Sequence, residues 1–168
     1  MTPMLTGFRV LDLTQFVAGP TCTRIMAELG ADVVKVELSP TGDHARQSGL
    51  RARGKNLENC TQSTYFIQHN HSKRSLAIDL KNPKGQALLK KMLPKFDVLV
   101  ENFAPGAVAR MGLDYDTVKE INPRIVMCSI SMAGQTGELS TQPGFDYMAS
   151  AYSGVTSAIG EGDRGPVQ

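Results

Sequence analysis

Residues 9–37 read RVLDLTQFVAGPTCTRIMAELGADVVKVE and decide the fold of this chain. Val10–Leu13 is a short apolar run with β-branched character, which indicates a strand. Gly19-Pro20 interrupts the apolar pattern, and Pro20 suits the first position of a helix because its missing N–H costs nothing there. The stretch therefore begins with a strand that leads directly into a helix.

The second half of the stretch completes a strand–helix–strand unit. Ile25, Met26 and Leu29 recur at helical spacing, and Gly30 suits the left-handed residue that often ends a helix. Val33–Val36 then forms a second strand. Because two strands joined by a helix are most often parallel, with a right-handed crossover, this unit predicts a parallel sheet.

The same alternation continues through the rest of the chain. Further strands are expected over residues 75–80, 97–101 and 124–131, and helices over residues 63–69, 83–93, 107–111, 116–121 and 146–153. This order predicts the α/β class, with an open, mainly parallel, Rossmann-like sheet and helices on both faces. Ligands of such sheets bind outside the carboxyl ends of the strands, where residues 14–18 and 102–106 are expected. The long polar stretch 38–64 is expected to be either a functional or a flexible loop.

The composition is typical of a globular protein with one domain. Of the 168 residues, 41% are hydrophobic and 20% are charged. A net charge of +2 is too small to indicate a nucleic-acid partner, and no apolar run approaches the ~20 residues of a membrane helix. Cys22, Cys60 and Cys128 lie far apart and are expected to be reduced thiols, which favours a cytoplasmic protein.

Few residues have the spacing of a known catalytic or metal-binding motif. No dinucleotide-binding, P-loop or nucleophile-elbow motif occurs in the sequence. His69 and His71 are half of a metal site at most, because no further His or paired Cys lies nearby, so no metal is expected. Lys73 and Arg74 are either a cation pair for phosphates or part of a solvated loop, and the pair alone favours the solvated loop.

Two further segments have a structural and a functional interpretation. Asn102–Gly106 follows a buried-looking strand, and Gly106 allows close backbone approach to a ligand; an ordinary Pro-Gly turn explains the segment equally well. Asp146 lies near a helix start after the fifth strand. A carboxylate stabilised by the helix dipole is the simpler interpretation of Asp146, and an active-site carboxylate is the other.

Taken together, the segments resemble the N-terminal part of a family III CoA-transferase of the CaiB/BaiF type. That family includes formyl-CoA transferase, carnitine CoA-transferase and α-methylacyl-CoA racemase. The motifs that carry the resemblance follow the family's order: Val10–Thr14 with Ala18–Pro20, Leu29–Glu37, Gly42-Asp43, Lys73–Ser75, Asp79–Lys81 with Pro83–Gly85, Val100–Phe103 with Pro105-Gly106, Arg110–Gly112, Asn122-Pro123, and Gly134–Gly137 with Gly144–Asp146. Each motif is weak alone, but the set is specific.

The resemblance implies a CoA site at the edge predicted above. It implies that Phe16, Val17 and Ala18 line the CoA and acyl site, that Ile78, Leu80 and Lys81 flank the adenine end, and that Asn102, Phe103, Ala107, Arg110 and Met111 hold the pantetheine and phosphates. Arg110 would supply charge to the phosphates. The resemblance also implies acyl-CoA and a carboxylic acid as substrates, no permanently bound cofactor, and a homodimer of interlocked chains.

Three positions depart from the family pattern. Val17 stands where formyl-CoA transferase has Gln, and Leu38 stands where it has an Arg near the phosphates. The acyl specificity and part of the phosphate clamp therefore do not transfer. Phe145 stands where the racemase branch has a proton-transferring His, and phenylalanine cannot do general acid–base work. This substitution favours a transferase over a racemase.

Members of the family are usually more than twice as long as this chain. The resemblance therefore implies that residues 1–168 are the N-terminal part of the CoA-binding large domain. The small domain, the C-terminal return segment and the nucleophilic aspartate would lie beyond Gln168, and Asp146 would be an auxiliary carboxylate. The expected function is transfer of CoA between carboxylic acids. A non-catalytic binding or assembly piece that needs a partner chain is the alternative, and an α-methylacyl-CoA racemase is the third reading.

Overall fold

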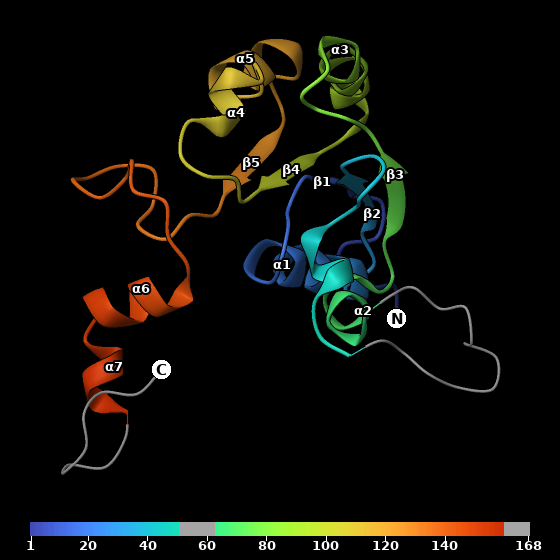
Figure 1. Ribbon diagram of the computed structural model, residues 1–168. Helices are drawn as coiled ribbons and strands as arrows, with labels where there is room; N and C mark the ends of the chain where they lie inside the picture. Colours follow the sequence, from blue (N-terminus) through green and yellow to red (C-terminus); the bar gives the residue numbers. More distant parts are fainter. Residues whose placement is uncertain (51–62, 160–168) are drawn as a thin grey trace.

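A computed structural model describes residues 1–50 and 63–159, which contain one five-stranded sheet. Figure 1 shows how the helices and strands are arranged. The strands are β1 (Arg9–Asp12), β2 (Asp32–Glu37), β3 (Arg74–Ala77), β4 (Val98–Glu101) and β5 (Val126–Ser129). Their order is β3-β2-β1-β4-β5, and every neighbouring pair is parallel. The predicted open, Rossmann-like α/β sheet is therefore confirmed.

Helices cover both faces of the sheet, as predicted. The helices are α1 (Ala18–Glu28), α2 (Thr64–Asn70), α3 (Pro83–Met92), α4 (Ala107–Arg110), α5 (Tyr115–Ile121), α6 (Asp146–Tyr152) and α7 (Val155–Ala158), with 3-10 turns at His44–Gln47 and Leu93–Lys95. Leu11 and Leu99 pack on one face against Leu89 of α3, whereas Val10 packs on the other face against Met26 of α1. Successive strand residues point to opposite faces, so each strand contributes to both cores.

Local sequence signals explain most of the element boundaries. Asn82 caps α3, because its Oδ1 accepts a hydrogen bond from Lys84 N at 2.9 Å, and Pro83 is the first helical residue. Gly30 has φ +101° after the end of α1, as predicted. Pro20 is the third residue of α1 rather than the first, so the predicted helix start was wrong by two residues.

The third and fifth strands are shorter than predicted. β3 ends at Ala77 instead of residue 80, because the chain turns at Asp79, whose Oδ1 accepts from Lys81 N. β5 spans Val126–Ser129 only. In residues 1–50 and 63–159, no helix is both long enough and apolar enough to cross a membrane.

The order in which the chain adds strands to the sheet reverses between β1 and β4. The chain moves from β1 to β2 on one side, and later returns to place β4 on the other side, so that Leu11 lies opposite both Val34 and Leu99. Crossovers leave β1 and β4 in opposite directions and open a crevice outside their carboxyl ends. Residues that follow these two strands are therefore the first place to look for a ligand site.

The helices α6 and α7 pack on each other and extend away from the sheet (Figure 1). Aromatic side chains at and just before α6 are exposed: Phe145, Tyr147 and Tyr152 retain 59%, 51% and 68% of their accessible surface. A group of exposed aromatic side chains commonly marks a contact with other polypeptide.

Candidate functional site

The carboxyl ends of β1 and β4 are joined by one side chain. Asn102, which follows β4, accepts a hydrogen bond from Gln15 N at 2.7 Å and donates one to Gln15 O at 2.8 Å. The amide of Asn102 thereby pairs with the backbone of Gln15 as a neighbouring strand would. The structure thus brings residues 14–18, called the Phe16 loop below, and the turn after β4 to one edge, as the sequence predicted.

Phe16 has an unusual backbone conformation at this edge. Its φ is +64°, which is uncommon for a residue with a side chain. Its N–H donates to Asp43 Oδ1 at 3.2 Å, and its ring stacks on His44 with centroids 5.5 Å apart. Such conformations persist only where surrounding contacts determine them, and they concentrate at functional sites.

A buried ion pair lies directly beneath the Phe16 loop. Lys35 Nζ lies 2.9 Å from Asp43 Oδ2, and it donates to Thr14 O at 2.6 Å. Both charged side chains are almost completely buried. Loss of either partner would leave the other charge buried and uncompensated, which is strongly destabilising. Neither Lys35 nor Asp43 was predicted as part of the site, although Lys35 lies in the Leu29–Glu37 motif and Asp43 in the Gly42-Asp43 motif.

A second buried ion pair supports the start of α1. Asp12 accepts hydrogen bonds from Thr14 and Thr23, and Lys73 Nζ lies 3.0 Å from its Oδ2. Burial lowers the pKa of Lys73 to about 8, although the Asp12 carboxylate acts in the opposite direction. The predicted solvated loop is therefore wrong for Lys73. Its neighbour Arg74 is exposed and donates to both carboxylate oxygens of Asp32.

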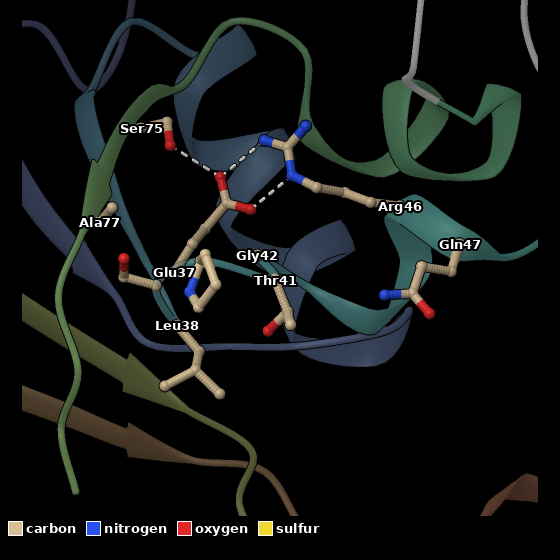
Figure 2. Close-up of a pocket in the computed structure, with 10 residues that line it drawn as sticks. Glu37, Leu38, Thr41, Gly42, Arg46, Gln47, Ser75 and Ala77 are labelled. Carbon is tan, nitrogen blue, oxygen red and sulfur yellow. Dashed lines mark hydrogen bonds and ion pairs between the residues drawn. The ribbon is translucent and has the colours of Figure 1, made fainter.

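An open pocket of about 460 Å³ lies at the carboxyl ends of β2 and β3 (Figure 2). Figure 2 shows the Glu37 carboxylate between Arg46 and Ser75. Arg46 donates hydrogen bonds of 2.6 and 2.7 Å to this carboxylate, and Ser75 donates one of 2.7 Å. Burial raises the pKa of Glu37, but hydrogen bonds from Arg46, Ser75 and the Asp43 N–H outweigh it and lower this pKa to about 2. Leu38, Ser39, Pro40, Thr41, Gly42, Gln47 and Ala77 complete the lining.

The residues predicted to flank adenine follow β3 beside this pocket, but two of them face the core. Ile78 and Leu80 are buried among the core side chains, with 6% and 9% of their surface exposed. Lys81 is exposed. Of these three, only the Lys81 side chain is free to reach a ligand from this edge without rearrangement of the core.

The remaining predicted residues gather around α4. Phe103 and Met111 are partly buried against the core, and Ala107 begins α4. Gly106 has φ +75° and leaves room for the Arg110 side chain, since a Cβ there would lie 3.2 Å from Arg110 Nη1. Arg110 is exposed and forms no ion pair with the described residues. It is therefore available for an anionic ligand.

Asp146 is the first residue of α6 and is exposed. The ring of the preceding Phe145 lies edge-on to Phe16, with centroids 6.2 Å apart. Val17 precedes α1, and Ala18 is its first residue. The structure therefore brings Asp146 near the Phe16 loop, at the same edge as Asn102.

His69 and His71, for which no metal was expected, have different partners. His69 Nδ1 lies 3.1 Å from Thr21 Oγ1, and His71 Nε2 lies 3.2 Å from Glu28 Oε1. Burial lowers the pKa of His69, with Arg24 contributing in the same direction. Within residues 1–50 and 63–159, no group of three His, Cys, Asp or Glu side chains has a metal-binding arrangement. Cys60 lies outside the described residues.

Comparison with known proteins gives a consistent result. A family model described as CoA-transferase family III matches residues 5–168. Succinyl-CoA:glutarate CoA-transferase from Homo sapiens is 42% identical over 164 residues, which cover 98% of this chain and 36% of the relative. Formyl-CoA:oxalate CoA-transferase from Rhodopseudomonas palustris is 42% identical over 167 residues, which cover 99% of this chain and 38% of the relative.

A solved structure agrees with these sequence matches. The crystal structure of a CaiB/BaiF family protein from Brucella suis has a TM-score of 0.90 and 35% identity to this chain. The match covers 100% of this chain and 44% of the other. The chain therefore spans less than half the length of the relatives and of the solved structure that it matches.

Proposed function

Because the chain belongs to CoA-transferase family III, we propose that it supplies the CoA-binding part of an acyl-CoA:carboxylate CoA-transferase. The observation that carries the proposal is the edge where Asn102 ties the Phe16 loop to the end of β4. At this edge the strand order of the sheet reverses, and ligands of open α/β folds bind at such a point. It also holds an exposed arginine with no ion pair among the described residues.

CoA would lie along this edge of the sheet. The open pocket beside β2 and β3 offers space for the nucleotide end, and Lys81 lies on the same side. Arg110 would pair with phosphate oxygens, and the partly apolar surface of Phe103 and Met111 would contact the pantetheine chain. The thioester would then reach the Phe16 loop. Because Ile78 and Leu80 are buried, they would support this wall through the core rather than touch adenine directly.

The reaction proposed for the whole enzyme is covalent catalysis. An aspartate carboxylate attacks the acyl-CoA thioester, which forms a mixed anhydride and releases CoA thiolate. The thiolate attacks the aspartyl carbonyl, giving an aspartyl-CoA thioester and the free carboxylate. A second carboxylate attacks this thioester, and the returning thiolate then takes the new acyl group and regenerates the aspartate. This sequence divides one exchange into easier steps.

Asp146 is the auxiliary carboxylate in this proposal, and the attacking aspartate is expected beyond Gln168. Phe145 beside it cannot transfer a proton, which favours the transferase over the racemase. The names of the relatives support a short acyl-CoA as the CoA donor and a short carboxylic acid as the acceptor. Val17 stands at the position that differs from formyl-CoA transferase, so the identity of the acyl group is left to experiment.

The exposed rings of α6 support the proposed homodimer, in which further polypeptide would cover them. No permanently bound cofactor is proposed, and a cytoplasmic location stays a prediction. A non-catalytic binding or assembly piece that needs a separate partner chain is the second candidate. The two candidates differ in CoA affinity, because an assembly piece has no need for a phosphate-binding arginine.

Calorimetric titration with CoA tests the proposal. Arg110→Ala should weaken binding by about 10- to 100-fold, as expected for a lost hydrogen bond to a charged group. Arg124→Ala is the matched control, because Arg124 is also exposed but precedes β5 at the opposite edge of the sheet. Unchanged affinity in Arg110→Ala would refute the role of Arg110. Absence of CoA binding by the unmodified chain would refute the proposed function of this chain.

A further inference from the structure

We infer that Asp43 is a positioning residue, which holds the Phe16 loop in the shape that receives the pantetheine end of CoA. The inference rests on the proposed function for the identity of the ligand. The contact between Asp43 and the Phe16 loop is observed in the structure and does not depend on the proposed function.

The contacts of Asp43 join two distant parts of the chain. Its Oδ1 accepts from Phe16 N at 3.2 Å and from Ala45 N at 2.9 Å. Its Oδ2 lies 2.9 Å from Lys35 Nζ, and its side chain has 0% exposure. Water therefore has no access to replace the carboxylate as the acceptor for the Phe16 N–H.

Asp43 contacts the backbone of Phe16, and its neighbour His44 contacts the ring. A residue at φ +64° is held there against its own preference, so a lost N–H acceptor would free the loop to move toward more common conformations. The ring of Phe16 stacks on His44, the residue that follows Asp43. A shift of the loop would therefore also change the aromatic surface beside Phe145.

The backbone of Asp43 is hydrogen-bonded to a residue that lines the open pocket. Its N–H donates to Glu37 Oε2 at 3.0 Å, and Glu37, Gly42 and Arg46 line that pocket. A change of the Asp43 side chain removes the contact with Phe16 but leaves this backbone hydrogen bond available. The pantetheine end and the nucleotide end of CoA should therefore respond differently.

The variants must avoid an unpaired buried lysine, which would destabilise the fold by itself. Both test proteins therefore carry Lys35→Met. The first adds Asp43→Asn, whose amide oxygen still accepts from Phe16 N and Ala45 N. The second adds Asp43→Ala, which has no acceptor. Asp114→Ala is the control for a lost carboxylate cap, because Asp114 accepts from Thr117 N at 3.1 Å on α5.

Two measurements decide the inference. Amide hydrogen exchange by NMR should show Phe16 exchanging at least about tenfold faster in the alanine double variant than in the asparagine double variant. Calorimetry should show about tenfold weaker CoA binding in the alanine double variant, while adenosine 3′,5′-bisphosphate binds both double variants equally. Asp114→Ala should change neither quantity.

Each outcome supports or overturns a defined statement. Equal Phe16 exchange in the two double variants would overturn the positioning role. Equal loss of affinity for CoA and for the bisphosphate would also overturn it, because general destabilisation affects both ligands. If the unmodified chain binds neither ligand, the proposed function fails, and the exchange measurement alone still decides whether Asp43 holds the loop.

Discussion

The side chain of Asn102 forms two hydrogen bonds with the backbone of one residue, Gln15, at 2.7 and 2.8 Å. These bonds join the carboxyl ends of β1 and β4, the two neighbouring strands between which the strand order reverses. The resemblance to the family had implied that Asn102 holds CoA. The structure shows its amide engaged with Gln15, so its contribution to CoA binding would be to shape the loop.

Asn102→Ala is expected to reduce both stability and CoA affinity. Removal of the amide leaves the N–H and C=O of Gln15 without these partners, which should lower the free energy of unfolding by about 2 kcal/mol. Urea denaturation measures this change. Asn82→Ala is the control, because it removes one hydrogen bond at an exposed helix start and should cost about 1 kcal/mol with no effect on CoA. Equal stability losses in the two variants would contradict the account.

Gly19→Ala is expected to displace the start of α1. A Cβ at Gly19 would lie 2.5 Å from Thr14 Cβ, which is closer than carbon atoms pack, and 3.1 Å from Asn102 Cγ, which is a tight contact. Overpacking of this kind should lower the free energy of unfolding by about 1–3 kcal/mol. Ala18→Ser adds one atom to the neighbouring exposed residue and should change stability by less than about 0.5 kcal/mol. Thermal denaturation of both variants compares the two sites, and an unchanged melting temperature for Gly19→Ala would disprove the close contact.

Lys73 and Arg74 are adjacent cations with opposite surroundings. Lys73→Met leaves Asp12 buried without its cation and should cost about 3–5 kcal/mol of unfolding free energy. Arg74→Met removes an exposed pair with Asp32 and should cost less than about 1 kcal/mol. Urea denaturation distinguishes the two, and similar small losses would show that the Lys73 pair contributes little.

Acid should destabilise the fold partly through Glu37. Its pKa in the folded chain is about 2 and its reference value is 4.5, so its contribution to stability is complete above pH 4.5 and is lost as the pH falls toward 2. Urea denaturation from about pH 5 to about pH 2.5 should therefore show a shallower decline for Glu37→Gln. The difference should reach at most about 1.4 kcal/mol per pH unit, the value for one proton. Glu120 is exposed, so Glu120→Gln should show the same decline of unfolding free energy with falling pH as the unmodified chain. An equally steep decline in Glu37→Gln would rule out the contribution of Glu37 to acid destabilisation.

The elements of the fold were predictable because their signals are local. Apolar periodicity marked β1 and α1, and the Asn82-Pro83 pair marked the start of α3. The sheet edge that joins the Phe16 loop to Asn102 followed from strand order alone, because the carboxyl ends of parallel strands lie at one edge.

The supporting charges were not predictable from the same signals. Lys73 lies 61 residues from Asp12 in sequence, and no local pattern indicates that a lysine so far away is buried beside that carboxylate. The end of β3 was also missed, because alternation continues through Leu80 while the backbone turns at Asp79. A side-chain contact between residues distant in sequence determines the burial of Lys73, and a single sequence does not contain it. The end of β3 depends on a local turn instead, in which Asp79 Oδ1 accepts from Lys81 N, and the continuing alternation conceals that turn.

The most direct test of the central claim is an NMR titration of the isotope-labelled chain with CoA. The account predicts that the largest amide shift changes fall on residues 14–18 and 102–111, at the carboxyl edge of the sheet. Amides at the opposite edge, such as Asp32 and Val126 at the starts of β2 and β5, should change little. Shift changes concentrated at that opposite edge, or none at saturating CoA, would contradict the account.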